Sequence, residues 1–277
     1  MTTLRVDGAD LSYEVRGAGT PIVFLHGLGS DGASWEAQVN TFAAHYRCIT
    51  LDFRGSGASR DHDNPRGPFS MSRFAADVHA LLQHLDASPT HVVGLSLGGM
   101  VAFQLAVDAP SCIRSLVIVN SGPAVVPRTL AERWAMTVRK IITRVWGPAA
   151  FGRILAPKLF PKPEHGELRE RFQRGMAAND KGAYLATLKA ILGWSVVDRI
   201  GEITAPSLIV SADNDYTSVE SKELYARRMP NARVAVVADS HHALPLESPD
   251  AFNAVLAEFL SEVDGAMSQT PDAAAAM

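Results

Sequence analysis

The chain has 277 residues, of which 47% are apolar and 20% are charged, and its formal net charge is -3. This length and composition allow one sizeable core and do not require two independent domains. The small net charge excludes the strongly basic footprint of a nucleic-acid-binding protein, and no stretch reaches the ~18 apolar residues that a membrane span needs. We therefore expect a small, partly apolar substrate and no nucleic-acid or membrane partner, while the oligomeric state stays open.

The N-terminal sequence MTTLRVDGAD lacks the basic and apolar regions of an export signal. Cys48 and Cys112 each stand alone in an apolar run, which favours buried free thiols over a disulfide or a metal site. Since the sequence has no cluster of cysteine and histidine, we expect no bound metal. These features together predict a cytoplasmic protein.

Short β-branched runs alternate with helix-length segments and predict an α/β fold. Residues 11–17 alternate polar and apolar side chains, and we expect them to form an antiparallel strand at the edge of the sheet. The later runs are continuously apolar, as is typical of a mostly parallel central sheet with helices on both faces. These strand candidates are residues 21–25, 46–51, 90–95, 114–119, 206–211 and 232–238.

The alternation stops between Gly122 and Ile203, where the sequence has helical patterns but no strand pattern. Residues 128–146 predict a helix with one apolar face, because apolar side chains recur there every three or four positions. That face consists of Leu130, Trp134, Val138, Ile141 and Val145. Further helices are expected over 166–178 and 182–193.

We interpret residues 123–203 as a helical cap over the carboxyl edge of the sheet, where ligands bind in open α/β folds. The core then consists of residues 1–122 and 204–264, and residues 265–277 are expected to be a disordered tail. From 128 to 199 the cap has fourteen Lys and Arg against six Asp and Glu. We interpret most of these charges as solvated faces and contacts with the acidic core; steering of an anionic substrate or docking on anionic lipid are the alternatives.

A G-x-S-x-G motif at 94–98 directly follows an apolar strand candidate and directly precedes a helical segment. This arrangement predicts a nucleophile elbow, in which Ser96 is lifted out of the sheet and lies at a helix N-terminus. Gly94 and Gly98 are required because side chains there would collide with the neighbouring strand and helix. A serine nucleophile also needs a base and a residue that orients the base, and both are expected later in the chain.

Two later strand candidates end in suitable groups: one is followed by Asp213 and Asp215, the other by His241 and His242. With these residues in view, the chain resembles the α/β-hydrolase family, specifically its capped branch of small esterases, enol-lactonases and haloperoxidase-like enzymes. The resemblance covers about residues 10 to 262. It includes the elbow, His26 and Gly27, and a D-x-R-G-x-G-x-S loop formed by Asp52, Arg54, Gly55, Gly57 and Ser59.

The resemblance implies specific catalytic residues. In the family a Glu and a Pro follow the histidine at fixed distances, so Glu247 and Pro249 select His242 as the base and leave His241 as the alternative. The family pattern G-x-x-D selects Asp215 as the acid, with Asp213 as the alternative in a turn. His241 stands where the family normally has glycine.

The oxyanion hole is expected to consist of two backbone N–H groups, that of Leu97 and, by resemblance, that of Leu28. We interpret His26, Asp52 and Arg54 as structural, the last two as a charge pair that braces a glycine-rich turn. Some aromatic residues are expected to line an apolar cleft under the cap and contact the substrate. The candidates for this role are Trp35, Trp134, Trp146 and Trp194.

The resemblance implies a serine hydrolase that cleaves a small ester through Ser96, His242 and Asp215 with an acyl-enzyme intermediate and no cofactor. Lactone, carbon–carbon bond or thioester hydrolysis and cofactor-free perhydrolysis are alternatives on the same triad. An alternative of another class is a ligand-binding signalling receptor with slow hydrolysis.

Overall fold

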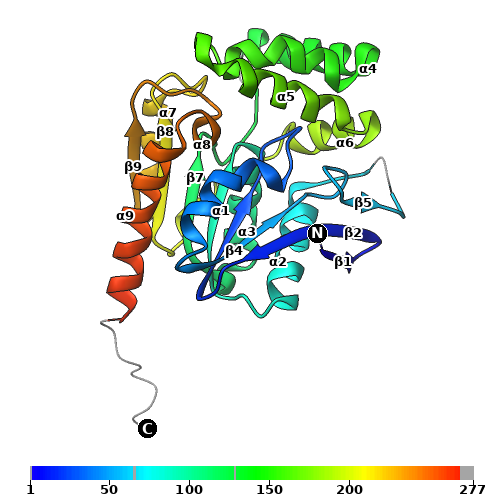
Figure 1. The fold of residues 1–277 in the computed structure, drawn as a ribbon. Coiled ribbons are helices and arrows are strands. Elements are labelled where there is room, and N and C mark those ends of the chain that lie inside the picture. Colours follow the sequence, from blue (N-terminus) through cyan, green and yellow to red (C-terminus); the bar gives the residue numbers. More distant parts are fainter. Residues whose placement is uncertain (1, 65–66, 128, 269–277) are drawn as a thin grey trace.

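The computed structural model describes residues 2–64, 67–127 and 129–268, which form one sheet with helices on both faces (Figure 1). Within these residues nine strands run in the order β1-β2-β4-β3-β6-β7-β8-β9, with β5 also paired to β2. Every pairing from β4 through β3 to β9 is parallel. The strands are β1 Thr2–Val6, β2 Ala9–Arg16, β3 Thr20–Leu25, β4 Tyr46–Leu51, β5 Arg60–Asp61, β6 Thr90–Leu95, β7 Ile113–Val119, β8 Ser207–Ala212 and β9 Ala232–Val237. The predicted fold class is confirmed.

The helices divide between the two faces of the sheet because side chains alternate along each strand. In β3, Val23 and Leu25 pack toward α2, α3 and α7, whereas Ile22 and Phe24 pack toward α1 and α9. The α-helices are α1 Glu36–Phe42, α2 Met71–His84, α3 Leu97–Asp108, α4 Leu130–Leu159, α5 Gly166–Ala178, α6 Lys181–Ile191, α7 Val219–Ala226, α8 Leu244–Glu247 and α9 Pro249–Ser268. The 3-10 helices are η1 Gly32–Trp35, η2 Pro110–Cys112, η3 Pro163–His165 and η4 Ile200–Glu202.

The predicted antiparallel strand at 11–17 corresponds to β2, but β2 is not at the edge of the sheet. Strand β1 pairs with its outer side, and a turn at Asp7 and Gly8 joins the two strands. Both turn residues have positive φ (40° and 76°), as a two-residue hairpin turn requires. The Asp-Gly pair is therefore the local signal for the hairpin, and the sequence interpretation overlooked it.

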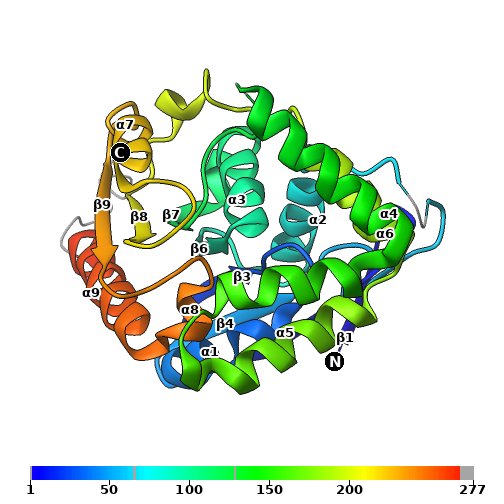
Figure 2. The ribbon, with the colours of Figure 1, turned by 90° about the horizontal axis from the view of Figure 1, so that it is seen from above.

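Helices α4, α5 and α6 lie between β7 and β8 in the chain and over one end of the sheet, as Figure 2 shows from above. The two ends of this inserted segment lie side by side. Ala124 forms an isolated antiparallel bridge with Ser195, and Val125 N–H donates to the Trp194 carbonyl at 2.9 Å. The cap therefore leaves the core and returns to it at one place.

The predicted apolar face of the first cap helix exists, but it does not face the core. Leu130 and Trp134 are 84% and 68% exposed, and Ile141 and Val145 are also exposed. Helix α4 begins with a capping box between Thr129 and Glu132 and bends at Gly147, whose backbone is not helical. The predicted helix is therefore confirmed, and most of its apolar face is exposed.

Helix α9 continues through Ser268, so residues 265–268, which we expected to belong to a disordered tail, are helical. The rest of the predicted tail lies outside the described residues. No helix in the described ranges combines the length and apolarity that crossing a bilayer would require.

Candidate active site

Ser96 lies in a sharp turn between β6 and α3. Its backbone has φ 53° and ψ -111°, an unusual conformation for a residue with a side chain. The turn is held from both sides: Ser96 N–H donates to the Val119 carbonyl at 3.0 Å, and the Ser121 hydroxyl donates to the Ser96 carbonyl at 2.6 Å. The strained turn aims the side chain of Ser96 into a cavity below the cap.

The glycines on either side of Ser96 have no room for a side chain. A Cβ atom at Gly98 would overlap the carbonyl oxygen of Leu25 in the neighbouring strand, and one at Gly94 would overlap the carbonyl oxygen of Gly98. These partners are backbone atoms, which cannot rotate away. The steric reason that we inferred for the motif is confirmed.

His242 follows β9, and Asp215 follows the adjacent strand β8. His242 Nδ1 and Asp215 Oδ1 are 2.7 Å apart, and the Asp215 carboxylate is fully buried. Burial alone would raise the pKa of Asp215, but the hydrogen bonds and charges of His242, Lys222 and Thr217 outweigh burial and hold that pKa well below its usual range. Asp215 therefore stays ionised and can orient the imidazole.

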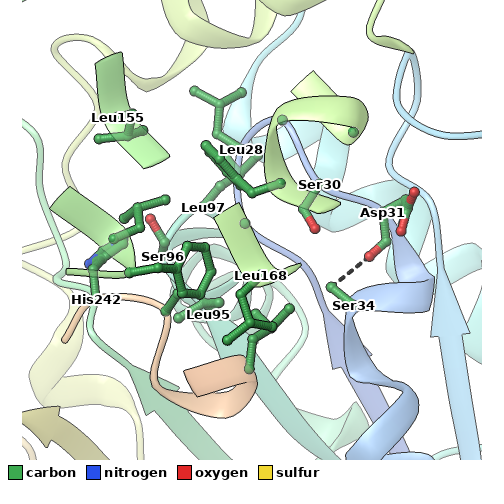
Figure 3. A pocket seen from close by; sticks show the side chains of 18 of the residues that line it. Leu28, Ser30, Asp31, Ser34, Leu95, Ser96, Leu97, Leu155, Leu168 and His242 are labelled. Carbon is green, nitrogen blue, oxygen red and sulfur yellow. Dashed lines mark hydrogen bonds between the residues drawn. The ribbon is translucent and has the colours of Figure 1, made fainter. Parts of the chain in front are cut away.

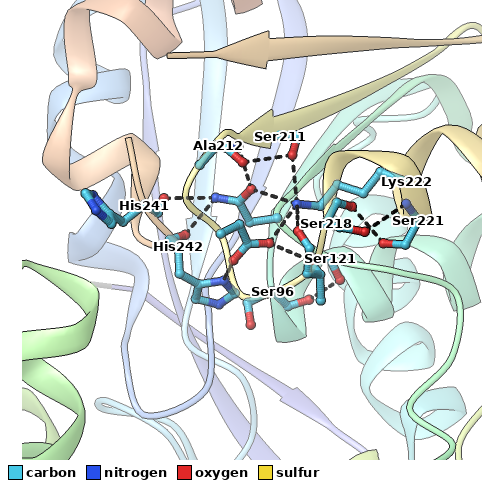
Figure 4. Close-up of polar contacts among 12 residues, drawn as sticks. Ser96, Ser121, Ser211, Ala212, Ser218, Ser221, Lys222, His241 and His242 are labelled. Atoms are coloured by element: carbon cyan, nitrogen blue, oxygen red, sulfur yellow. Dashed lines mark hydrogen bonds and ion pairs between the residues drawn. The ribbon is translucent and has the colours of Figure 1, made fainter. Parts of the chain in front are cut away.

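The other oxygen of the same carboxylate binds a buried lysine that the sequence analysis did not identify. Lys222 Nζ lies 2.7 Å from Asp215 Oδ2 and also donates to Ser211 Oγ at 2.9 Å and to the Thr217 carbonyl at 3.1 Å (Figure 4). Burial lowers the pKa of Lys222, and the adjacent Asp215 counteracts part of this effect. Lys222 fixes Asp215 from the side opposite to His242.

Asn120, which follows β7, connects the loops that carry Asp215 and His242. Its Nδ2 donates to the carbonyls of His241 and His242 at 3.1 and 3.0 Å. Its Oδ1 accepts from the N–H of Ala212 at 2.8 Å and from Lys222 Nζ at 3.3 Å. The only sequence signal for this residue is a polar side chain at the end of an apolar strand.

Ser96 and His242 meet at one cavity of about 330 Å³. Figure 4 shows the serine side chain beside the imidazole ring, although no direct hydrogen bond joins the two side chains. Such bonds are often formed only when substrate is present. The ring of Tyr216 stacks on the imidazole of His242, with 3.9 Å between ring centroids and 26° between planes.

Leu28 and Leu97 also line this cavity, as Figure 3 shows. No acceptor among the described residues binds the backbone N–H of either leucine. The cap holds the loop that carries Leu28, because Asn179 Nδ2 donates to the Gly29 carbonyl at 3.1 Å. Met176 packs so closely that a Cβ atom at Gly29 would overlap its sulfur.

The alternative acid and base have other partners. His241 Nδ1 lies 2.8 Å from the buried Glu247, which also accepts the His241 N–H, and Figure 4 shows the ring directed away from Ser96. The carboxylate of Asp213 accepts the N–H groups of Asp239 and Ser240, both at 3.0 Å. His241 and Asp213 therefore brace the loop after β9.

His26, Asp52 and Arg54 hold the backbone near the cavity. His26 Nε2 accepts the Phe53 N–H at 3.0 Å, and burial lowers the pKa of His26, so the neutral ring suits this bond. Asp52 accepts the N–H groups of Gly32 and Ala58, both at 2.7 Å.

The expected pair between Asp52 and Arg54 does not form. Arg54 binds the buried Asp77 with two nitrogens and Asp61 with a third. Asp52 and Arg54 therefore both have structural contacts, but these belong to separate hydrogen-bond networks.

None of the four tryptophans expected to contact the substrate lines the cavity. Trp35 is buried between Phe24 and Phe252, with centroid distances of 5.2 and 6.1 Å. Trp134 and Trp146 are exposed, and Trp194 Nε1 donates to Gln104 Oε1 at 2.7 Å. The apolar wall instead includes Leu155, Leu159, Phe160, Leu168, Phe172 and Leu246.

Comparison with known proteins agrees with this fold. The model of the alpha/beta hydrolase fold family matches residues 20–249. A proposed carbamate hydrolase, RutD, of Azorhizobium caulinodans is 34% identical over 267 residues, which cover 92% of this chain and 97% of the relative. The chain therefore belongs to the alpha/beta hydrolase fold family.

Two solved structures are similar in fold. An enol-lactonase from Burkholderia xenovorans superposes with a TM-score of 0.86 at 24% identity, covering 94% of this chain and all of that chain. A thermophilic esterase from Thermogutta terrifontis superposes with a TM-score of 0.83 at 25% identity, covering 95% and 97%. In the part of the chain that the structure describes, no group of three or more His, Cys, Asp or Glu is arranged to hold a metal ion.

Proposed function

We propose that the protein is a serine hydrolase that cleaves a small ester through Ser96, His242 and Asp215. The observation that carries this proposal is the 2.7 Å contact between His242 and the ionised Asp215, at a cavity into which the strained Ser96 turn also points. Ser96 attacks the ester carbonyl while His242 takes the hydroxyl proton and passes it to the leaving alcohol. Water activated by His242 then releases the acid from the acyl-enzyme.

The backbone N–H groups of Leu28 and Leu97 form the oxyanion hole in this proposal. Both are at the cavity and free of other acceptors among the described residues, and loss of one such donor typically costs ~3 kcal/mol of transition-state stabilisation. The protonated form of His242 that develops during attack lies between Asp215 and the ring of Tyr216. No step requires a metal or an organic cofactor.

The relatives support hydrolysis but differ in the bond that their names specify, which includes carbamate, lactone and ester bonds. We propose the ester bond because the mostly apolar cavity suits a small ester, and all of these bonds share the acyl-transfer mechanism. Cys48 and Cys112 are buried free thiols, which suits a reducing compartment such as the cytoplasm.

The experiment is a panel of aryl esters, alkyl esters, lactones and acyl thioesters, measured with the wild-type protein and with Ser96→Ala. We expect sustained turnover of at least one small ester by the wild type and none by the variant. A serine-directed phosphonate should label one site in the wild type and no site in Ser96→Ala. A single burst of product without turnover would instead favour a receptor, and labelling that persists in the variant would contradict the assignment of Ser96.

A further inference from the structure

Two arginines from the cap line the otherwise mostly apolar cavity. Arg139 extends from α4 and Arg171 from α5, and neither forms an ion pair with a carboxylate among the described residues. Among the described residues that line the cavity, Asp31 is the one that carries a carboxylate. A guanidinium that loses water without an anionic partner is unfavourable, so its place in a cavity wall calls for an explanation.

The two arginines have different surroundings. Arg171 is exposed at the mouth of the cavity, where one of its nitrogens donates to the Ala33 carbonyl at 2.9 Å. Asp31 accepts the N–H of the same residue, Ala33, at 3.1 Å. Arg171 and Asp31 therefore contact the same short turn, although no ion pair joins the two side chains.

Arg139 is half-buried, and its contacts among the described residues are with neutral groups. One of its nitrogens donates to the hydroxyl of the buried Tyr184 at 3.0 Å, and its guanidinium lies 4.8 Å above the ring of Phe151. Its Nε is buried and has no hydrogen-bond partner. Contacts with a neutral hydroxyl and a ring fix the position of the guanidinium but leave its charge available.

Arg139 lines the same cavity as the residues proposed to react with the substrate. The ring of Tyr184 lies against Gly29, the neighbour of the proposed oxyanion donor Leu28. Arg139 also shares the cavity with Ser96 and His242. An anionic group of a bound ester could meet Arg139 while the carbonyl of that ester lies at Ser96.

We propose that Arg139 binds a carboxylate of the substrate, so that the preferred substrates are small esters that carry a free carboxylate away from the scissile bond. This inference rests on the proposed function and refines its substrate class. A guanidinium suits this role because it offers a planar pair of donors to the two carboxylate oxygens.

The test compares monoethyl esters of succinic, glutaric and adipic acid with the neutral ethyl butanoate, pentanoate and hexanoate. A second series, acetyl esters of hydroxy acids and of simple alcohols, places the carboxylate on the leaving group instead. We expect the wild type to have a higher kcat/KM for the anionic ester in at least one series. Arg139→Met should reduce that preference by about 10- to 100-fold, the usual range for a hydrogen bond to a charged group, with little change for neutral esters.

Arg144→Met is the matched control, because Arg144 belongs to the same helix and is exposed away from the cavity lining. It should retain the wild-type preference. Arg139→Lys should restore part of the preference, because it retains the charge without the planar donors. Equal labelling of Ser96 by a neutral phosphonate in all variants would show that the site is intact.

A binding measurement separates this inference from the proposed function. Calorimetry with Ser96→Ala, alone and combined with Arg139→Met, measures binding of monoethyl glutarate and ethyl pentanoate without turnover. Tighter binding of the anion that disappears in the double variant would support the carboxylate site even if no ester were hydrolysed. The inference is overturned if neither anionic series is preferred, or if the preference persists in Arg139→Met.

Discussion

Lys222 Nζ and Asp215 Oδ2 are 2.7 Å apart in a buried ion pair, on the side of the carboxylate opposite to His242. We expect Lys222→Met to lower kcat by about tenfold, because Asp215 loses an anchor. Because its hydrogen bonds hold the pKa of Asp215 below its usual range, the carboxylate stays ionised around neutral pH, and the loss of Lys222 acts through the position of the carboxylate.

The measurement is kcat corrected for the folded fraction, with the exposed Lys189→Met as the control, which should match the wild type. Activity lost in Lys222→Met only in proportion to unfolded protein would show that Lys222 contributes to folding alone.

The same ion pair predicts a change in stability at alkaline pH. In Asp215→Asn, Lys222 keeps its burial but loses its counter-charge, so its pKa in the folded protein falls further below the ordinary ~10.4. Between these two pKa values the unfolded chain binds more protons than the folded protein, and stability therefore rises with pH. We expect the urea midpoint of Asp215→Asn to increase between pH 7 and about 10.

The control is Asp215→Asn combined with Lys222→Met, which lacks the titrating group. The urea midpoint of this double variant should not show the additional rise with pH. Parallel curves for the single and double variants would mean that Lys222 does not titrate in this range.

The two adjacent histidines should differ sharply in their effect on turnover. His242→Ala should lose about as much activity as Ser96→Ala, because triad members act as a unit. His241→Ala should retain most activity, because its ring binds Glu247 and points away from Ser96. Steady-state kinetics of both variants decide this, and the reverse ranking would assign the base to His241.

Substitutions of the two candidate acids should affect different properties, turnover for Asp215 and stability for Asp213. Asp215→Asn should lower turnover by up to about four orders of magnitude with little effect on substrate binding. Asp213→Asn should keep most activity but lower the free energy of unfolding by about 1 kcal/mol, because Asp213 accepts two backbone N–H groups. Steady-state kinetics and urea unfolding of both variants check this. If Asp213→Asn were stable but almost inactive, Asp213 would be the acid that orients the histidine.

The elbow should not tolerate even one additional carbon atom. We expect Gly98→Ala to destabilise the protein by about 3 kcal/mol, because the new Cβ would overlap the Leu25 carbonyl and the backbone must move. Gly166→Ala is the control, since a Cβ there meets no atom within 4 Å. Urea unfolding of the two variants should show a large and a negligible shift, and equal shifts would contradict the steric argument.

The predictable features of this protein have local signals in the sequence. Glycines around Ser96 and apolar strands identified the elbow and the sheet, and a fixed spacing to Glu247 selected the histidine that does contact Asp215. Lys222 was not predicted, because a lysine on a short helix gives no indication that it is buried beneath a carboxylate.

The wrong predictions for cap residues such as Trp134 have a similar cause. The spacing of Leu130 and Trp134 predicts one apolar side of a helix, but it does not reveal whether that side meets the core or the solvent. The orientation of α4 depends on contacts with α5 and α6, which involve residues far apart in the chain. Tryptophan also fits both a core and a pocket, and Trp35 belongs to the core.

The bridge between Ala124 and Ser195 has a consequence for how the specificity of this protein can change. Because the two ends of the cap segment lie side by side in the structure, recombination can replace the intervening residues as one unit without moving the two ends. Such an exchange replaces ten of the 24 residues that line the cavity, Arg139 among them, but leaves Ser96, Asp215 and His242 in place. It must preserve the contact of the cap with the Gly29 loop. Substrate preference and the proposed acyl-transfer chemistry can therefore diverge on separate stretches of one gene.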